Sequence, residues 1–228
     1  MKKSIPYILI VIAALSGIIF RGGFFSSDTQ GEDTNISQQN KVVSNKIDNQ
    51  FDTLLIYPKK NLIPDFQFNN HLGDIFTNND FKGYWNLIFI GFTNCPDVCP
   101  NTLNQMVHLY NAMDETTRSK FQFAFLTVDP ERDTIEHLNA YIDYFHSSFI
   151  GLHGKKEQID PVIRSLGGIY TLNKDEGEYY SVDHSSRIFI VGPKADRFGI
   201  IESGALKGDN KLQLAKDLTT LSSSHSSN

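Results

Sequence analysis

The chain has 228 residues, of which 40% are hydrophobic, and its formal net charge at pH 7 is −5. This length and composition predict one globular domain with a real core, plus appended segments. No basic run occurs beyond Lys2 and Lys3, so a nucleic-acid partner is not expected. The two cysteines are too few, and too close together, to build a framework of structural disulfides.

Residues 1–25 form a predicted targeting segment. Two lysines precede an uncharged apolar run from Ile5 to Phe20. A membrane-spanning helix needs about 20 apolar residues, so this run is slightly short. We expect an uncleaved signal anchor in a bacterial inner (cytoplasmic) membrane, with the rest of the chain facing the periplasm or the outer face. The alternative is a signal peptide cleaved after Ser16, because the preceding residues have the small-residue pattern of a cleavage site.

The globular domain is expected to occupy residues 54–221. Residues 26–53 are rich in Ser, Asn, Gln, Asp and Thr, and this polar composition predicts a flexible tether. Residues 222–228 are predicted to be a disordered tail. The sequence therefore predicts a single-pass membrane protein that carries one folded domain on a tether.

Hydrophobic periodicity places the elements of the domain. An N-terminal β-hairpin is predicted from Phe66 to Thr77, with His71 solvated in its turn. Next come a strand at 85–92, a helix at 102–113, a strand at 121–128, a helix to about 145, a strand at 149–152, a helix at 155–166, an inserted hairpin at 169–182, strands at 187–191 and 198–201, and a helix at 210–221. Asp133, with Glu136 three residues later, is expected to cap a helix. This order predicts an α/β protein of thioredoxin-like plan, with a central mixed sheet flanked by helices.

The two cysteines, Cys95 and Cys99, lie at the junction between the first buried strand and the first long helix. Pro96 and Pro100 can each occupy a first helical turn, where a missing N–H group costs nothing. A helix N-terminus favours negative charge, so thiolates are expected there, and thiolates bind metals or attack disulfides. The CxxxC spacing alone leaves redox-active, metal-binding and accidental pairs open.

Asp183 and His184 stand just before a late strand of the predicted sheet. In a thioredoxin-like sheet the loop that enters this strand faces the cysteine loop, and thioredoxins place a cis-proline there. This chain has no proline between Pro161 and Pro193. We therefore expect the His184 imidazole to reach the two sulfurs, with Asp183 orienting the ring. The alternative for His184 is a buried histidine whose hydrogen bonds are satisfied without a metal.

Two thiolates and one imidazole would make a soft site with three ligands. Structural zinc takes four protein ligands. Copper(I) accepts thiolate and imidazole at low coordination number, and the same donors suit copper(II). Met106 and Met113 are expected in the core, because their helical spacing is more typical of packing than of copper ligation.

Three motifs resemble the SCO/SenC family of copper-binding assembly factors for cytochrome c oxidase. They are the segments Gly91–Pro100, Val128–Thr134 and Tyr180–Ser186, and the similarity runs from about residue 64 to residue 221. Asn94 is a departure, because many members of the family carry histidine at this position. The position is not one of the copper ligands of the family, so the binding hypothesis is unaffected.

The resemblance implies a thioredoxin fold and one copper ion per chain, as Cu(I) or Cu(II), bound by Cys95, Cys99 and His184. It also implies transfer of copper to the binuclear CuA centre of oxidase subunit II, or reduction of the cysteines of that subunit. We therefore expect a membrane-tethered copper chaperone, rather than an enzyme. Its expected partners are oxidase subunit II or a related subunit, a copper donor protein and a thiol reductant.

The alternative function uses the same cysteines as a redox pair without a physiological metal. The protein would then be a thiol–disulfide oxidoreductase, and Cys95 and Cys99 would be its catalytic residues. A peroxidase-like activity and a copper or redox sensor also remain open. His184 distinguishes the first two hypotheses, because copper binding needs the imidazole as a ligand and thiol exchange does not.

Overall fold

The structure, a computed structural model, describes residues 51–224. The predicted membrane anchor (residues 1–25) and residues 26–50 of the predicted tether lie outside this range. The folded part begins slightly earlier than the predicted residue 54, because the backbone N–H groups of Asp52 and Thr53 donate to Asp217 Oδ2 at 3.0 and 2.8 Å. None of the helices described here has the length and apolar character that crossing a membrane requires.

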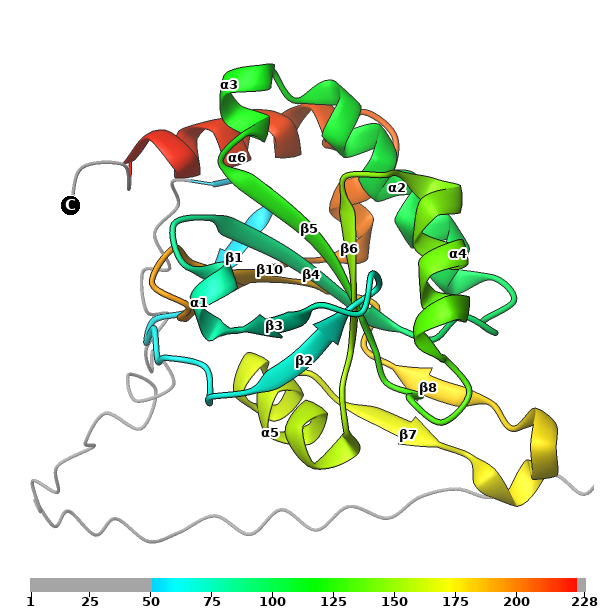
Figure 1. Ribbon diagram of the computed structural model, residues 1–228. Helices are drawn as coiled ribbons and strands as arrows, with labels where there is room; N and C mark the ends of the chain where they lie inside the picture. Colours follow the sequence, from blue (N-terminus) through cyan, green and yellow to red (C-terminus); the bar gives the residue numbers. More distant parts are fainter. Residues whose placement is uncertain (1–50, 225–228) are drawn as a thin grey trace, which may run out of the picture. The chain divides into compact units, whose positions relative to one another are not determined.

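An eight-stranded mixed sheet forms the centre of the domain, in the order β1-β10-β9-β4-β5-β6-β2-β3 (Figure 1). The strands are β1 (Leu54–Ile56), β2 (Gln67–Asn70), β3 (Ile75–Thr77), β4 (Trp85–Gly91), β5 (Phe121–Thr127), β6 (Phe149–His153), β9 (Ile188–Val191) and β10 (Arg197–Ile201). The β4, β5 and β6 strands are parallel, and the other pairings are antiparallel. The thioredoxin-like plan with a mixed sheet is confirmed.

Helices cover both faces of this sheet. They are α1 (Asn78–Phe81), α2 (Val98–Ala112), α3 (Glu115–Arg118), α4 (Ile135–Phe145), α5 (Lys156–Leu166) and α6 (Asn210–Ser224), and a 3₁₀ turn, η2, spans Ser203–Leu206. Figure 1 shows α2, α4 and α6 on one side of the sheet and α5 on the other. The prediction of a tail from residue 222 is wrong for its first three residues. Residues 222–224 form the end of α6. Leu221 and Ser222 are buried, so this end of the helix packs against the domain.

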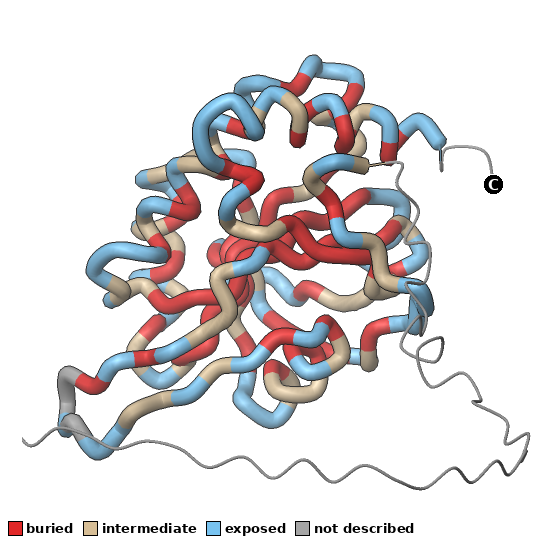
Figure 2. The backbone as a smooth tube through the Cα atoms, turned by 180° about the vertical axis from the view of Figure 1, so that it is seen from behind, coloured by how far each residue is buried: buried red, intermediate tan, exposed pale blue. Residues whose placement is uncertain are grey.

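The core lies around the central strands. All seven residues of β4 are buried, and six of the seven residues of β5 are. Strands that are covered on both faces need continuous apolar runs rather than alternation, which explains the sequence of these two strands. Figure 2 shows the buried segments gathered at this centre. Met106 and Met113 lie in the same core, as predicted, with exposed fractions of 0% and 4%.

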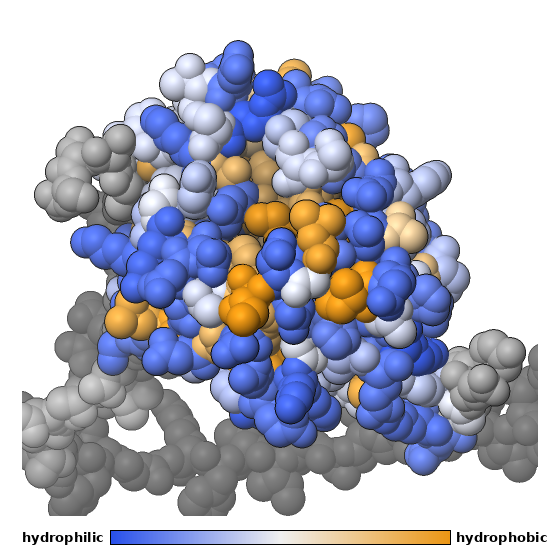
Figure 3. All heavy atoms as spheres, viewed as in Figure 1, coloured by the Kyte–Doolittle hydropathy of each residue, from blue (hydrophilic) through white to orange (hydrophobic). Residues whose placement is uncertain are grey.

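The predicted N-terminal hairpin is present as β2 and β3, paired beside β6 at one edge of the sheet. The prediction for His71 is wrong. Its ring is buried against β6, and Nδ1 accepts the N–H of Gly151 at 3.2 Å. The edge strands β1 and β3 have three residues each, and such short edges limit pairing with other chains. The surface in Figure 3 is largely hydrophilic and is interrupted by small hydrophobic groups.

The inserted hairpin is a separate two-stranded ribbon of β7 (Tyr170–Leu172) and β8 (Val182–His184). A 3₁₀ segment, η1 (Lys174–Tyr179), joins the strands. The sequence predicted that the second strand would begin at residue 179, but it begins at residue 182. As a result His184 ends a strand opposite Tyr170, instead of standing in a loop.

Candidate metal centre

The two cysteines lie where β4 passes into α2. Cys95 is in the connecting loop and half-buried, and Cys99 is in the first turn of the helix and fully buried. The N–H of Cys99 donates to Cys95 Sγ at 3.4 Å, whereas the N-cap residue Asp97 makes no side-chain cap hydrogen bond. The Cys95 sulfur therefore satisfies one of the N–H groups that every helix leaves unpaired at its start.

Gly91 provides the space for the Cys99 sulfur. A β-carbon at this last residue of β4 would lie 2.7 Å from Cys99 Sγ and 2.8 Å from the Phe125 ring. A side chain at position 91 would therefore displace one or the other. Sequence reasoning did not assign this role, although Gly91 opens the first of the three motifs.

His184 reaches Cys99 from the end of β8. Its Nε2 lies 3.3 Å from Cys99 Sγ. Its Nδ1 lies 3.1 Å from the carbonyl oxygen of Ser185, which can only accept a hydrogen bond, so Nδ1 carries the proton and Nε2 keeps its lone pair toward the sulfur. The rings of Phe89 and Phe92 pack edge-on against the imidazole, with centroids at 5.8 and 6.2 Å.

The expected role of Asp183 is not confirmed. Its side chain is exposed and accepts a hydrogen bond from Asn173 Nδ2 at 3.1 Å. Side chains alternate between the two faces of a strand, so Asp183 and His184 point to opposite sides of β8. The backbone of Ser185, rather than Asp183, orients the ring.

The three predicted ligands come together as expected. One Sγ atom from each cysteine and one ring nitrogen of His184 all lie within 4.8 Å of one another. Among residues 51–224 this is the only cluster of three or more such side chains with metal-binding spacing. Two sulfurs and a nitrogen fit copper better than structural zinc, which takes four protein ligands.

Burial controls the protonation of the site. It lowers the pKa of His184, although the Ser185 carbonyl and Asp183 oppose this shift, so the ring is neutral and able to bind a metal at neutral pH. Burial also raises the pKa of the Cys99 thiol well above its ordinary value. The expectation that the helix N-terminus would favour a thiolate is therefore wrong for Cys99 in the metal-free protein. A metal must displace the Cys99 proton.

The second motif supports the cysteine loop rather than capping a helix. The N-cap of α4 is Thr134. The fully buried Asp133 accepts hydrogen bonds from the N–H and Oγ1 of Thr93, at 3.0 and 2.6 Å, and from Thr127 Oγ1 at 2.5 Å. Thr93 stands two residues before Cys95, so this carboxyl group fixes the loop that carries the first sulfur. The capping-box pattern hid this role, because an aspartate beside a helix start is usually a cap.

Two hollows open near the cluster of Cys95, Cys99 and His184. One, of about 410 Å³, is lined by His184 together with Ile169 and Arg187. The other, of about 340 Å³, lies at the start of α2 beside Val98. The side chains of Val98 and Ile169 are 45% and 76% exposed, so hydrophobic groups stand at the rim of the site. The first hollow therefore opens the His184 side of the site to the surface.

Comparison with known proteins gives consistent matches. The family model SCO1/SenC matches residues 56–221. A protein of Stutzerimonas stutzeri that carries the provisional name copper-binding protein is 36% identical over 151 residues, which are 66% of this chain and 74% of that protein. The human mitochondrial SCO1 homolog is 36% identical over 152 residues, which are 66% of this chain but 50% of that protein.

Solved structures agree with these matches. The structure of Bradyrhizobium japonicum ScoI with copper bound aligns with a TM-score of 0.62 at 30% identity, and the alignment covers 70% of this chain and 99% of that one. The solution structure of apo Sco1 from Thermus thermophilus aligns with a TM-score of 0.64 at 29% identity, covering 73% of this chain and 94% of that one.

Proposed function

Because the chain belongs to the SCO1/SenC family, we propose that it is a copper chaperone that assists assembly of the CuA centre of cytochrome c oxidase. Copper is its cargo, held as one ion by Cys95, Cys99 and His184. The observation that carries this proposal is the convergence of two sulfurs and one imidazole nitrogen within 4.8 Å. The relative from Bradyrhizobium japonicum, whose structure contains copper, supports it.

The chemistry of the three donors suits a metal that must be passed on. Thiolate sulfur and imidazole nitrogen are preferred ligands of copper(I), and two thiolates also stabilise copper(II) together with a nitrogen donor. Three protein ligands leave room for a ligand from a client, such as a cysteine of oxidase subunit II. The hollow beside His184 gives such a client access to the metal.

The proposed place of action is the outer side of a bacterial cytoplasmic membrane. Residues 1–25 would anchor the protein there, and residues 26–50 would let the domain reach a membrane-bound oxidase subunit. The support for this part is the apolar run from Ile5 to Phe20 and its flanking lysines. A copper donor protein would load the site, and a thiol reductant would keep its two cysteines reduced.

Copper(I) titration of the reduced full-length protein tests the proposal. We expect one equivalent to bind and to raise the unfolding midpoint, because a ligand that binds only the folded state stabilises it. Cys95→Ala and Cys99→Ala should each abolish tight binding, since each leaves one thiolate and one imidazole. Protein in which the two cysteines form a disulfide should lose copper. An unchanged unfolding midpoint at saturating copper(I) would rule out the chaperone.

A second candidate function is thiol–disulfide exchange, which the proximity of the two sulfurs favours. Cys95, the more exposed of the two, would attack a target disulfide and form a mixed disulfide with it. Cys99 would then attack Cys95 Sγ and release the target as a dithiol, leaving Cys95 and Cys99 oxidised. A thiol reductant would restore the reduced pair. The raised pKa of Cys99 suits it to this second step rather than to the first attack.

A further inference from the structure

The strand that carries His184 is not part of the main sheet. Within residues 51–224, β8 pairs only with β7, and the two strands form their own ribbon (Figure 1). β8 has three residues, too few to hold a fixed position by its own hydrogen bonds. The hydrogen-bond ladder of the main sheet therefore does not set the distance between His184 and the cysteines. Other contacts must hold the ribbon in place.

Tyr180, two residues before β8, makes three contacts with the loop after β5. Its hydroxyl donates to Asp129 Oδ1 at 2.5 Å. Its carbonyl oxygen accepts a hydrogen bond from Arg132 Nη1 at 2.9 Å. The Arg132 guanidinium also lies 3.6 Å from the centre of the Tyr180 ring. Two hydrogen bonds and a cation–π contact thus bind one residue of the ribbon to one short loop.

The carboxyl group in this contact is fully buried and needs each of its partners. Asp129 accepts the Tyr180 hydroxyl on one oxygen and forms an ion pair with Arg132 through the other. Burial and the Asp129 carboxylate raise the pKa of Tyr180 to about 12, so its hydroxyl keeps the donated proton. A buried network of this kind favours one geometry, because loss of any partner leaves a polar group unsatisfied.

The same loop also holds the cysteine side of the site. Asp133, four residues after Asp129, binds Thr93 in the loop of Cys95. Arg132 lies 5.6 Å from the centre of the Phe92 ring, and that ring packs against His184. The five-residue segment 129–133 therefore contacts both of the chain segments that carry the proposed metal ligands.

We propose that Asp129, Arg132 and Tyr180 are positioning residues that hold β8 so that His184 Nε2 faces the Cys99 sulfur. Asp133 does the same for the cysteine loop through Thr93. The motif Val128–Thr134, between β5 and α4, thus contacts both halves of the metal centre and sets the spacing between them. The expected effect on copper affinity rests on the proposed copper function, whereas the positioning of His184 is a property of the metal-free protein.

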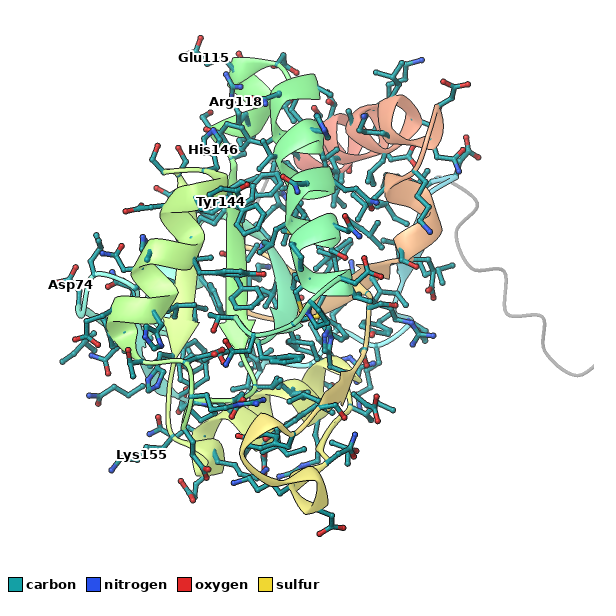
Figure 4. The ribbon with its side chains drawn as sticks, turned by 90° about the vertical axis from the view of Figure 1, so that its right-hand side faces the viewer. Asp74, Glu115, Arg118, Tyr144, His146 and Lys155 are labelled. Carbon is teal, nitrogen blue, oxygen red and sulfur yellow. The ribbon has the colours of Figure 1, made fainter. Side chains whose placement is uncertain are left out.

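The test compares Tyr180→Phe with Tyr110→Phe in the full-length protein. Tyr110 is a matched control, because its hydroxyl contacts Ser148 Oγ at 3.3 Å and Arg118 lies 4.8 Å from its ring. It is 11 residues beyond Cys99 on α2, about 16 Å along the helix. Figure 4 shows its neighbours Arg118 and His146 at the end of the molecule opposite the β7–β8 ribbon.

Three properties are measured on each variant: hydrogen exchange, copper(II) affinity and the rate of disulfide formation. Hydrogen exchange of the metal-free protein should become faster in residues 180–186 of Tyr180→Phe while the central strands stay protected. Copper(II) affinity of the same variant should fall by about tenfold or more, as is usual when a group that orients a metal ligand is removed. The rate of disulfide formation between Cys95 and Cys99 should match wild type, because Asp133 still holds their loop. Tyr110→Phe should change none of the three.

The exchange measurement needs no metal, so it tests positioning even if the wild-type protein binds no copper. If wild type binds copper and Tyr180→Phe behaves like Tyr110→Phe in hydrogen exchange and in copper(II) affinity, the positioning role is wrong and the copper function stands. If Tyr180→Phe does not fold cooperatively, Arg132→Lys takes its place. It keeps the charge beside Asp129 but loses the fork that reaches the Tyr180 carbonyl, and the same selective pattern is expected.

Discussion

The Cys99 sulfur occupies the space that a side chain on Gly91 would need, because a β-carbon there would lie 2.7 Å from Cys99 Sγ. The other neighbour of that position, Phe125, is fully buried and lies at 2.8 Å. Neither group can move freely, since the cysteine side chain is short and the aromatic ring is packed in the core. The end of β4 therefore fixes how deeply the second sulfur sits in the site.

Gly91→Ala should weaken copper binding and destabilise the fold. The added methyl group must push the sulfur away from His184 or shift Phe125, and such overpacking costs roughly 1–3 kcal/mol. Gly204→Ala is the control, because a β-carbon there has no atom within 4 Å. Copper(I) titration and chemical unfolding measure the two effects. If the two alanine variants bind copper equally well, the close approach of Gly91 and Cys99 has no functional consequence.

Copper affinity should rise with pH, because binding must displace the proton of Cys99. Burial raises the pKa of this thiol, so it remains protonated through the neutral range. Each proton released makes the apparent affinity rise about tenfold per pH unit. Competition with a copper(I) chelator between about pH 6 and pH 8 measures this slope. A flat profile would contradict a protonated Cys99 in the metal-free protein.

The same pKa shift predicts how the metal-free protein responds to alkali. As the pH rises, the folded state keeps the Cys99 proton after the unfolded chain has lost it. The free energy of unfolding that the protonated thiol contributes is therefore fully present below the ordinary thiol pKa of about 8.5 and is lost as the pH rises above it. Cys99→Ala should lack this alkaline loss. Denaturant unfolding at neutral and alkaline pH compares the two proteins.

The convergence of Cys95, Cys99 and His184 and the overall plan could be predicted from the sequence, because each depends on a local pattern. The apolar run of β4 identifies a buried strand, and the CxxxC spacing marks its junction with a helix. Thioredoxins place a proline before the late strand, and this chain has none there, which pointed to His184 as the third member of the site. Each of these inferences needed only neighbours in the chain or the known topology of the sheet.

The supporting contacts could not be predicted, because they join residues far apart in sequence. Asp133 binds Thr93, 40 residues away, and Asp129 binds Tyr180, 51 residues away. Local rules assigned Asp133 to a helix cap and His71 to a solvated turn. Tertiary burial overrides both assignments, because a polar group buried in the domain must find a partner wherever the fold places one.

His71 should make the domain less stable in mild acid. Burial lowers its pKa, although Asp143 opposes the shift, so the unfolded chain takes up a proton before the folded state does. The stability that the neutral ring contributes is present above about pH 6.5 and is lost as the pH falls below it, by at most about 1.4 kcal/mol per pH unit. Protonation would also remove the acceptor of the Gly151 N–H.

His71→Asn isolates this effect, because the amide oxygen can accept the Gly151 N–H but does not titrate. The loss of unfolding free energy between about pH 7.5 and pH 5 should be smaller in this variant than in wild type. His108→Asn, at an exposed histidine of α2, should leave the loss unchanged. Equal losses in all three proteins would show that folding does not lower the pKa of His71.

His184→Ala distinguishes the two candidate functions. Without the imidazole, the two thiolates should still hold copper(I) with lower affinity, whereas copper(II), which depends more on nitrogen, should be lost more completely. The disulfide between Cys95 and Cys99 should form and be reduced at rates comparable to wild type, because exchange between sulfurs does not need this ring as a ligand. His108→Ala, remote from the metal centre, is the matched control. In cells, the His184 variant should fail to support oxidase assembly at normal protein levels. If these cells assemble oxidase normally and cysteine variants do not, the protein acts by thiol–disulfide exchange and copper ligation is not its working function.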